Sequence, residues 1–243
     1  MIKNYIVYFL CKFSLHARVR RRVKSYKYMQ KIKTIVLENG TGHEICLNDF
    51  DKVKNIFVKL RGRQDKTNQL IIELPQPQKL EINLLFNGQN NIVRFGENCF
   101  GKWGIASYQN NNKCSIGKGT SCSGPTYISL INNDLQIGEN CMFSNNIHIW
   151  GDGHSVLSWP DKKVVNIPVE PIKIGNHCWV GERVTLTKNA QIPDDCIVGI
   201  ASVVTKKFEE GHVVLAGAPA KIVRRNVTWD GLPPMEYEKL NHN

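Results

Sequence analysis

The sequence predicts an all-β fold, a parallel β-solenoid, from a six-residue repeat in its second half. Each group of six has an aliphatic first residue, a small fifth residue and often a glycine in second place. The first positions hold Ile174, Val180, Leu186, Ile192, Val198 and Val204. The fifth positions hold Cys178, Val184, Ala190, Cys196 and Ser202. Each group would form a short strand and a tight corner, and three groups would close one turn of a triangular prism.

The same motif recurs upstream at a longer spacing. Phe95, Ile116 and Ile137 are each followed by glycine and lie 21 positions apart. Since three groups of six make 18, we expect about three extra residues per turn, in a corner bulge or loop. Asparagine-rich segments at 87–91, 110–112 and 132–133 each precede a predicted strand. We expect them at corners, because asparagine and glycine tolerate unusual backbone angles.

The first 33 residues form a basic arm, which we expect to cap the end of the solenoid. It contains ten Lys and Arg residues and no acidic residue, against a net charge of +11 for the whole chain. Such an arm can be simply solvated, or it can attract an anionic membrane surface, an acidic polysaccharide or nucleic acid. No stacking motif of a nucleic-acid fold accompanies it, so nucleic acid is not expected as a partner.

Four short strands are predicted ahead of the regular repeat, over residues 33–37, 56–60, 69–74 and 80–84. They indicate a solenoid domain over residues 34–225. The alternative is a separate N-terminal β domain before residue 90.

The sequence also bears on where the protein works. It contains no run of 18 apolar residues, so no conventional transmembrane helix is expected. Arginines follow the short N-terminal apolar run where a small-residue cleavage site would lie, which argues against a signal peptide. We expect a cytoplasmic protein, with the inner face of the cell membrane as a site of peripheral association.

The eight cysteines have neither CxxC nor zinc-ligand spacing, so no metal site is expected. Cys122 falls in a first position of the repeat, and five others fall in fifth positions. These five are Cys99, Cys114, Cys141, Cys178 and Cys196. We therefore expect free, buried thiols that pack as small apolar groups.

Two segments depart from the repeat. Residues 150–171 are polar and punctuated by glycine and proline, and they predict a loop extruded from the solenoid, where function often resides. Residues 206–225 are expected to leave the prism and return along it. Residues 226–243 read as a polar tail, either mobile or packed on a neighbouring subunit.

Four motifs carry a resemblance to a known family. They are GDGHS at 151–155, IGNHCWVG at 174–181, VGIASVVTK at 198–206 and AGAPAKIVR at 216–224. The chain resembles the hexapeptide-repeat acyltransferases with a left-handed parallel β-helix. Within them it is most similar to bacterial O-acetyltransferases of capsule, O-antigen and other surface sugars. The resemblance implies a homotrimer that binds acetyl-CoA in the groove between adjacent prisms.

The resemblance maps the general base onto His154, at the start of the extruded loop. This assignment is chemically reasonable, because imidazole titrates near neutral pH and can take a proton from an acceptor hydroxyl. The alternative is a loop histidine without a special role. Asp152 either orients the imidazole or only forms the turn between two glycines. His148 is the competing base.

Motif position also assigns the cofactor and acceptor contacts. The cofactor-binding residues implied are Trp179, Glu182, Ile200, Thr205, Lys206, Lys221 and Arg224, of which the cations suit the phosphates of coenzyme A. The substrate-binding candidates are Trp150, Trp159 and His148, whose rings suit either a sugar or a subunit interface. No metal ligand is assigned.

Rival functions on the same fold stay open. An N-acetyltransferase acting on an amino-sugar, free or nucleotide-linked, would share the base and the cofactor. A metal hydratase needs three histidine ligands, and the sequence lacks their spacing. An inert binding solenoid would need neither His154 nor a coenzyme A groove. The preferred acceptor is a surface polysaccharide, with an anionic, sialylated capsule among the candidates.

Overall fold

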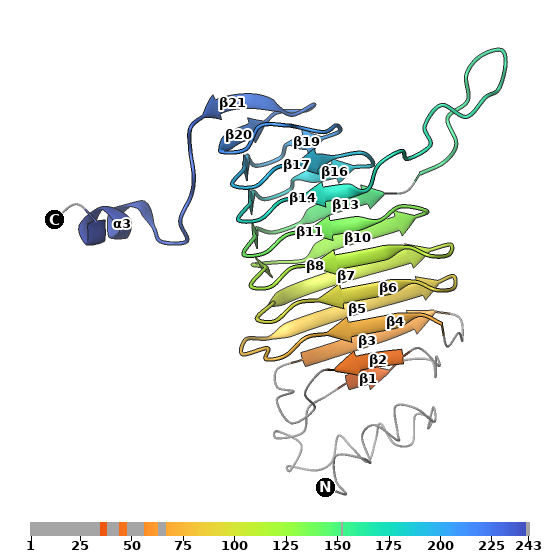
Figure 1. The fold of residues 1–243 in the computed structure, drawn as a ribbon, viewed down its shortest axis with the longest axis horizontal. Helices are drawn as coiled ribbons and strands as arrows, with labels where there is room; N and C mark the ends of the chain where they lie inside the picture. The colour runs from red at the N-terminus through yellow and green to blue at the C-terminus, as the bar shows by residue number, and fades with distance from the viewer. Residues whose placement is uncertain (1–34, 38–43, 48–55, 63–66, 152, 242–243) are drawn as a thin grey trace, which may run out of the picture.

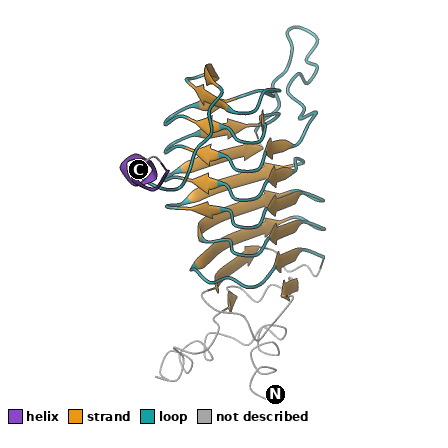
Figure 2. Ribbon diagram, turned by 60° about the vertical axis from the view of Figure 1, so that its left-hand side comes forward, coloured by secondary structure: helices purple, strands orange, loops and turns teal. Residues whose placement is uncertain are grey.

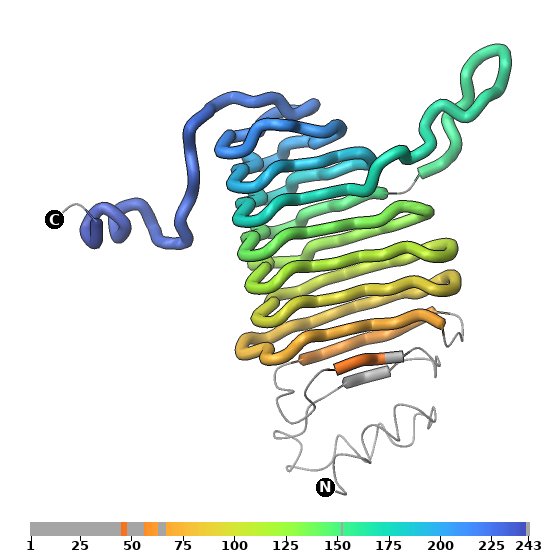
Figure 3. The backbone as a smooth tube through the Cα atoms, viewed as in Figure 1, coloured from red at the N-terminus to blue at the C-terminus, as the bar shows by residue number. Residues whose placement is uncertain are grey.

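The computed structural model describes residues 35–37, 44–47, 56–62, 67–151 and 153–241. The strands form three sheets, called sheets A, B and C, along a stack of turns (Figure 1, Figure 2). The strands of the first described turns alternate between sheets A and B, and from β9 (Ser121–Cys122) onward the chain also adds strands to sheet C. The tube in Figure 3 shows the same path of the chain through the stacked turns. The predicted all-β solenoid is confirmed, and the only helix among the described residues is α3 (Pro234–Asn241).

Strand order within each sheet follows the sequence. Sheet A contains β1 (Ile35–Leu37), β3 (Ile56–Gly62), β5 (Leu80–Asn87), β7 (Gly101–Tyr108), β10 (Thr126–Ile131), β13 (Ile147–Gly151), β16 (Thr185–Thr187) and β19 (Val203–Val204). Sheet B contains β2 (Glu44–Leu47), β4 (Gln69–Ile72), β6 (Ile92–Phe95), β8 (Lys113–Ile116), β11 (Leu135–Ile137), β14 (Ile172–Ile174) and β17 (Gln191–Ile192). Sheet C contains β9 (Ser121–Cys122), β12 (Met142–Phe143), β15 (Trp179–Val180), β18 (Ile197–Val198), β20 (Val213–Ala216) and β21 (Lys221–Arg225).

Pairing on sheet B confirms the register read from the repeat. Phe95 pairs with Ile116, and Ile116 pairs with Ile137. Ile137 then pairs with Ile174 across the inserted loop, and Ile174 pairs with Ile192. All five side chains are buried. The first position of each group therefore points into the prism, as expected.

The described strands before residue 90 join the same sheets. β1, β3 and β5 precede β7 in sheet A, and β2 and β4 precede β6 in sheet B. Strand β2 has no counterpart in the sequence-based expectations. The basic arm, residues 1–33, lies outside the described residues.

The three extra residues of the long turns do not form a bulge or loop, so that expectation is wrong. They lengthen the strands of sheet A: β7 has 8 residues and β10 has 6, whereas β16 has 3. Because successive side chains of a strand point to opposite faces, the longer strands place further side chains inside the prism, Leu130 among them. The prism is therefore wider on this face before the loop than after it.

Buried asparagines form a ladder at the corner between sheets A and B. The amide N–H of Asn91 donates to Oδ1 of Asn68 at 2.9 Å. The amide N–H groups of Asn112 and Asn133 donate in turn to the preceding asparagine Oδ1, each at 3.0 Å. The ladder satisfies backbone groups that the corner would otherwise leave unpaired. The predicted asparagine corners are confirmed.

The wide turns are filled by aromatic side chains from all three sheets. Trp103 of sheet A is fully buried and meets Phe95 of sheet B edge-on, with ring centroids 5.9 Å apart. Its other neighbour is Phe143 of sheet C, at 5.7 Å. The Trp103 indole N–H donates to the carbonyl oxygen of Phe100 at 3.2 Å. These rings join the sheets across the prism interior.

The C-terminal segment does not leave the prism at residue 206, which corrects the expectation. The amide of Phe208 donates to the Gln191 carbonyl at 2.9 Å, and β20 pairs in parallel with β18. Residues 206–216 thus complete one more turn, because Phe208 fills the core position that follows Ile192. Only β21 runs back, antiparallel to β20. Helix α3 follows in the tail and stands apart from the stack (Figure 1).

The cysteines of the repeat are free and buried, as expected. These are Cys99, Cys114, Cys122, Cys141, Cys178 and Cys196. Burial, with a smaller contribution from the charge of Asp134, raises the pKa of Cys114 to about 12. Burial also raises the pKa of Cys122 to about 11. The thiols of Cys114 and Cys122 are therefore protonated and shielded in the folded protein.

These thiols predict an alkaline limit to stability. A raised thiol pKa stabilises the fold below the unfolded value of 9.0, and this contribution is lost as pH rises toward about 12. At about pH 8 a double variant, Cys11→Ser with Cys46→Ser, should react with a thiol-specific disulfide reagent only after unfolding. Rapid labelling of the native variant would contradict the burial. Urea titrations above pH 9.0 should show a falling free energy of unfolding.

Candidate functional site

The extruded loop is a hairpin that leaves sheet A after β13 and re-enters sheet B at β14. Leu157 and Val164 form an antiparallel bridge. The amide of Val165 donates to the Val156 carbonyl at 2.9 Å. The hairpin extends away from the stack of turns (Figure 1), and Trp159 near its tip is 87% exposed.

His154 lies at the root of this hairpin and is exposed. Asn166 on the returning strand holds the backbone around it. The Asn166 amide group donates to the His154 carbonyl at 2.8 Å, and the amide of Val156 donates to Asn166 Oδ1 at 2.8 Å. Asn166 was not among the sequence candidates, because it lies 12 residues along the chain from His154.

The loop exit itself requires glycine. A Cβ atom on Gly151 would lie 3.0 Å from Leu130 Cδ2. The backbone of Gly153 has a φ of +148°, which residues with a side chain rarely adopt. The same Gly153 position is 3.7 Å from the Lys188 ammonium, so a cation lies against the root of the loop. Asp152, the expected orienting residue, lies outside the described residues.

Three aromatic rings lie together on the outer face of sheet A beside the loop root. His148 stacks on Tyr127 with centroids 5.2 Å apart and on Trp150 at 5.9 Å. Tyr127 and His148 are register partners on β10 and β13. The structure thus brings together His148 and Trp150, two of the acceptor candidates, and adds Tyr127. The third candidate, Trp159, is distant in the hairpin.

Five of the seven proposed cofactor contacts lie on or directly after strands of sheet C, and the other two lie after sheet A. Trp179 lies on sheet C and is 38% exposed. Glu182 and Ile200 follow sheet C in consecutive turns, joined by the Ala201 amide, which donates to the Glu182 carbonyl at 2.8 Å. Thr205 and Lys206 follow sheet A at another corner. Lys221 and Arg224 lie on β21.

The cations in this set differ from their neighbours in charge pairing. Lys207 pairs with Glu209 at 3.0 Å, and Arg225 pairs with Glu210 at 3.0 Å. Within the described ranges, no acidic partner lies within ion-pair distance of the three predicted phosphate contacts. These are Lys206, Lys221 and Arg224. Unpaired cations of this kind are free to hold phosphates, so the donor set fits the expected coenzyme.

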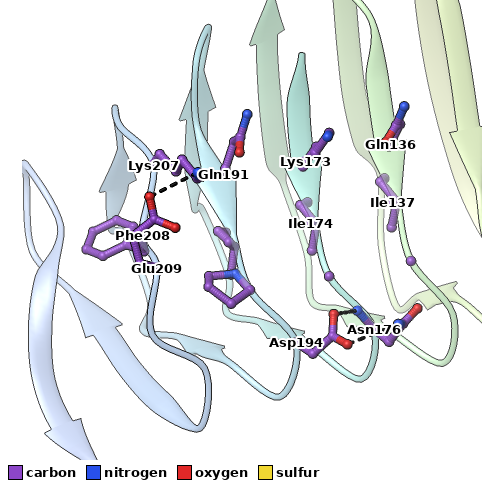
Figure 4. Close-up of a pocket in the computed structure, with 14 residues that line it drawn as sticks. Gln136, Ile137, Lys173, Ile174, Asn176, Gln191, Asp194, Lys207, Phe208 and Glu209 are labelled. Atoms are coloured by element: carbon purple, nitrogen blue, oxygen red, sulfur yellow. Dashed lines mark hydrogen bonds and ion pairs between the residues drawn. The ribbon is translucent and has the colours of Figure 1, made fainter. Parts of the chain in front are cut away.

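The outer face of sheet B carries an open hollow of about 440 Å³ (Figure 4). Lys207 with Glu209, and Asn176 with Asp194, lie at its margins. None of the sequence-predicted site residues lines this hollow. It therefore adds no support to the predicted site.

Sequence reasoning missed a cluster formed by the C-terminal tail. Trp229 stacks on His177 with centroids 4.6 Å apart, and its indole N–H donates to the His177 carbonyl at 2.7 Å. Asp195 Oδ1 forms a hydrogen bond with His177 Nδ1 at 2.8 Å. Trp229 also lies 6.3 Å from Trp179. Because these residues are 18 to 52 positions apart, no sequence signal joined them.

The described ranges lack two further features. They contain no group of three or more His, Cys, Asp or Glu side chains arranged to hold a metal ion. They also contain no helix long and apolar enough to cross a membrane.

The chain is similar to curated O-acetyltransferases, although no family model matches it. Galactoside O-acetyltransferase of Escherichia coli (strain K12) is 30% identical over 129 residues, covering 45% of this chain and 63% of that protein. Polysialic acid O-acetyltransferase of Escherichia coli O1:K1 / APEC is 29% identical over 119 residues, covering 49% and 38%. The chain thus spans less than two thirds of the length of either relative.

Similarity to a solved structure extends further. The crystal structure of the polySia-specific acetyltransferase NeuO is 27% identical to this chain, with a TM-score of 0.69. The superposition covers 86% of this chain and 94% of NeuO. The two proteins therefore share the solenoid fold over nearly the whole of NeuO.

Proposed function

We propose that this chain, a homologue of the hexapeptide-repeat acyltransferases, is an O-acetyltransferase that moves acetyl from acetyl-CoA to a hydroxyl of a bacterial surface carbohydrate. The relatives named for galactoside and polysialic acid support this substrate class. The observation that carries the proposal is the extruded hairpin with His154 clamped at its root by Asn166. An exposed imidazole held at the loop root can take a proton from the hydroxyl of a bound acceptor.

In this mechanism His154 is the general base of a ternary complex. Its imidazole takes the proton from the acceptor hydroxyl as the hydroxyl oxygen bonds to the thioester carbonyl carbon. The tetrahedral intermediate expels the coenzyme A thiolate, which takes the proton back from the imidazolium. No acyl-enzyme is formed. Asp152 remains the proposed orienting residue for the imidazole.

We place the coenzyme between two copies of the chain in a homotrimer. The candidate contacts divide between sheet C and the corner after sheet A, and a second solenoid would complete the groove that holds the coenzyme. Lys206, Lys221 and Arg224 would hold the phosphates, and Thr205 would lie beside them. Trp179, Glu182 and Ile200 would line the path of the pantetheine arm. Exposed apolar side chains of the hairpin, such as Val165 and Val169, would contact the neighbouring subunit.

The setting of the reaction follows from its donor. Acetyl-CoA is made inside cells, so we propose that transfer takes place in the cytoplasm. The basic arm would hold the trimer at the inner face of the membrane or against an anionic polysaccharide.

The test is release of coenzyme A thiol by the purified protein with four acceptors: polysialic acid, methyl β-galactoside, glucosamine and none. We expect acceptor-dependent release with a hydroxyl acceptor and an acetylated product that mild alkali cleaves, as an ester. An alkali-stable product formed only with glucosamine would instead establish the N-acetyltransferase. Absence of release with every acceptor would contradict the proposal.

A further inference from the structure

The outer face of sheet A carries an ordered aromatic row that the mechanism above does not use. Tyr127 stands on β10, and His148 and Trp150 stand on the neighbouring strand β13. Their rings stack at interplanar angles of 27° and 15°. Tyr127 is 45% exposed and Trp150 is 42% exposed. Several exposed aromatic side chains in one contiguous patch are typical of a surface that contacts a ligand or another protein.

The surroundings of the row favour a small polar ligand. Tyr127 is the register partner of Gly104, and its Cδ1 atom would lie 3.3 Å from a Cβ atom placed there. A side chain at position 104 would therefore crowd the tyrosine ring. On the far side, the register partners of His148 and Trp150 are Thr185 and Thr187. Aromatic rings and hydroxyl or imidazole groups thus lie side by side on this face.

This combination of aromatic rings and hydrogen-bonding groups matches the chemistry of a pyranose. A sugar ring offers a face of C–H bonds to an aromatic ring and an edge of hydroxyl groups to hydrogen-bonding side chains. The row also lies next to the loop root: Trp150 is four residues from His154 along the chain, and Gly151 between them is buried at the end of β13. A saccharide on the row would therefore lie beside the root of the loop that carries His154.

We propose that Tyr127 is an acceptor-binding residue, which forms with His148 and Trp150 a subsite for one pyranose ring of the acceptor glycan. The inference rests on the proposed function for the identity of the ligand. The inference adds a residue that lies outside the family motifs. It also places the acceptor glycan on the outer face of sheet A.

Equilibrium binding without acetyl-CoA tests the subsite independently of catalysis. Polysialic acid and methyl β-galactoside would be titrated by calorimetry into the wild type, Tyr127→Ala, Tyr127→Phe and Phe57→Ala. Phe57 is the matched control, because it is 42% exposed on the same sheet but lies on β3 and contacts Lys79 instead of the row. We expect Tyr127→Ala to weaken saccharide binding about tenfold, with Tyr127→Phe retaining most affinity and Phe57→Ala unchanged.

Three results would overturn the subsite. They are no saccharide binding to the wild type, equal losses in Tyr127→Ala and Phe57→Ala, or a fall in oligomer mass in Tyr127→Ala, which would make the row a contact between copies. Steady-state kinetics separates this inference from the proposed function. Acetyl transfer with an unchanged acceptor KM in Tyr127→Ala would leave the reaction standing and remove the subsite. We expect that variant to raise the acceptor KM with the acetyl-CoA KM unchanged.

Discussion

Replacing His154 with alanine is expected to lower kcat for acetyl transfer by about 10²–10⁴-fold, the usual contribution of a positioned general base. The side chain is exposed and makes no contact with the core, so the melting temperature should not change. The KM for acetyl-CoA should also stay close to that of the wild type, because the imidazole acts on the acceptor. Thiol release under saturating substrates measures the first effect.

Two companion variants make the His154 result specific. His212→Ala removes another exposed histidine, which lies 4.0 Å from Asp195 and away from the loop, and should leave activity unchanged. Asn166→Ala removes the two hydrogen bonds at the loop root and should lower kcat by a smaller factor. Retention of more than about a tenth of the wild-type kcat in His154→Ala would contradict the base assignment.

Replacing Trp103 with alanine is expected to destabilise the solenoid by about 3–5 kcal/mol, the usual cost of removing a large buried aromatic side chain. The indole joins all three sheets, because it contacts Phe95 and Phe143 and donates to the Phe100 carbonyl. A cavity in place of the indole would remove the packing contacts between the neighbouring turns of the solenoid. We expect a large fall in melting temperature.

Trp159→Ala is the matched control for the core substitution. It removes the same side chain from a site that is 87% exposed, so stability should change by no more than about 0.5 kcal/mol. Urea unfolding followed by circular dichroism compares the two variants. Equal midpoints would contradict the assignment of Trp103 to the core.

The sequence alone predicted the repeat, its register and its interior. Aliphatic first positions such as Ile174 and Ile192, and small fifth positions such as Cys178, are set by local geometry: a residue six positions on meets the same narrow prism. The same local pattern predicted the free buried thiols and the loop, since a segment without the period cannot continue the stack. The motif carrying His154 was visible for the same reason.

Only the tertiary structure decided which residues from different turns meet. Tyr127 reaches His148 because parallel strands place residues 21 positions apart side by side, and Trp229 reaches His177 across 52 positions. The extra residues of the long turns became longer strands in sheet A because their alternate side chains, such as Leu130, gain more from burial than a bulge would give. Pairing across turns depends on stacking, and a six-residue period contains no information on which outward side chains then touch.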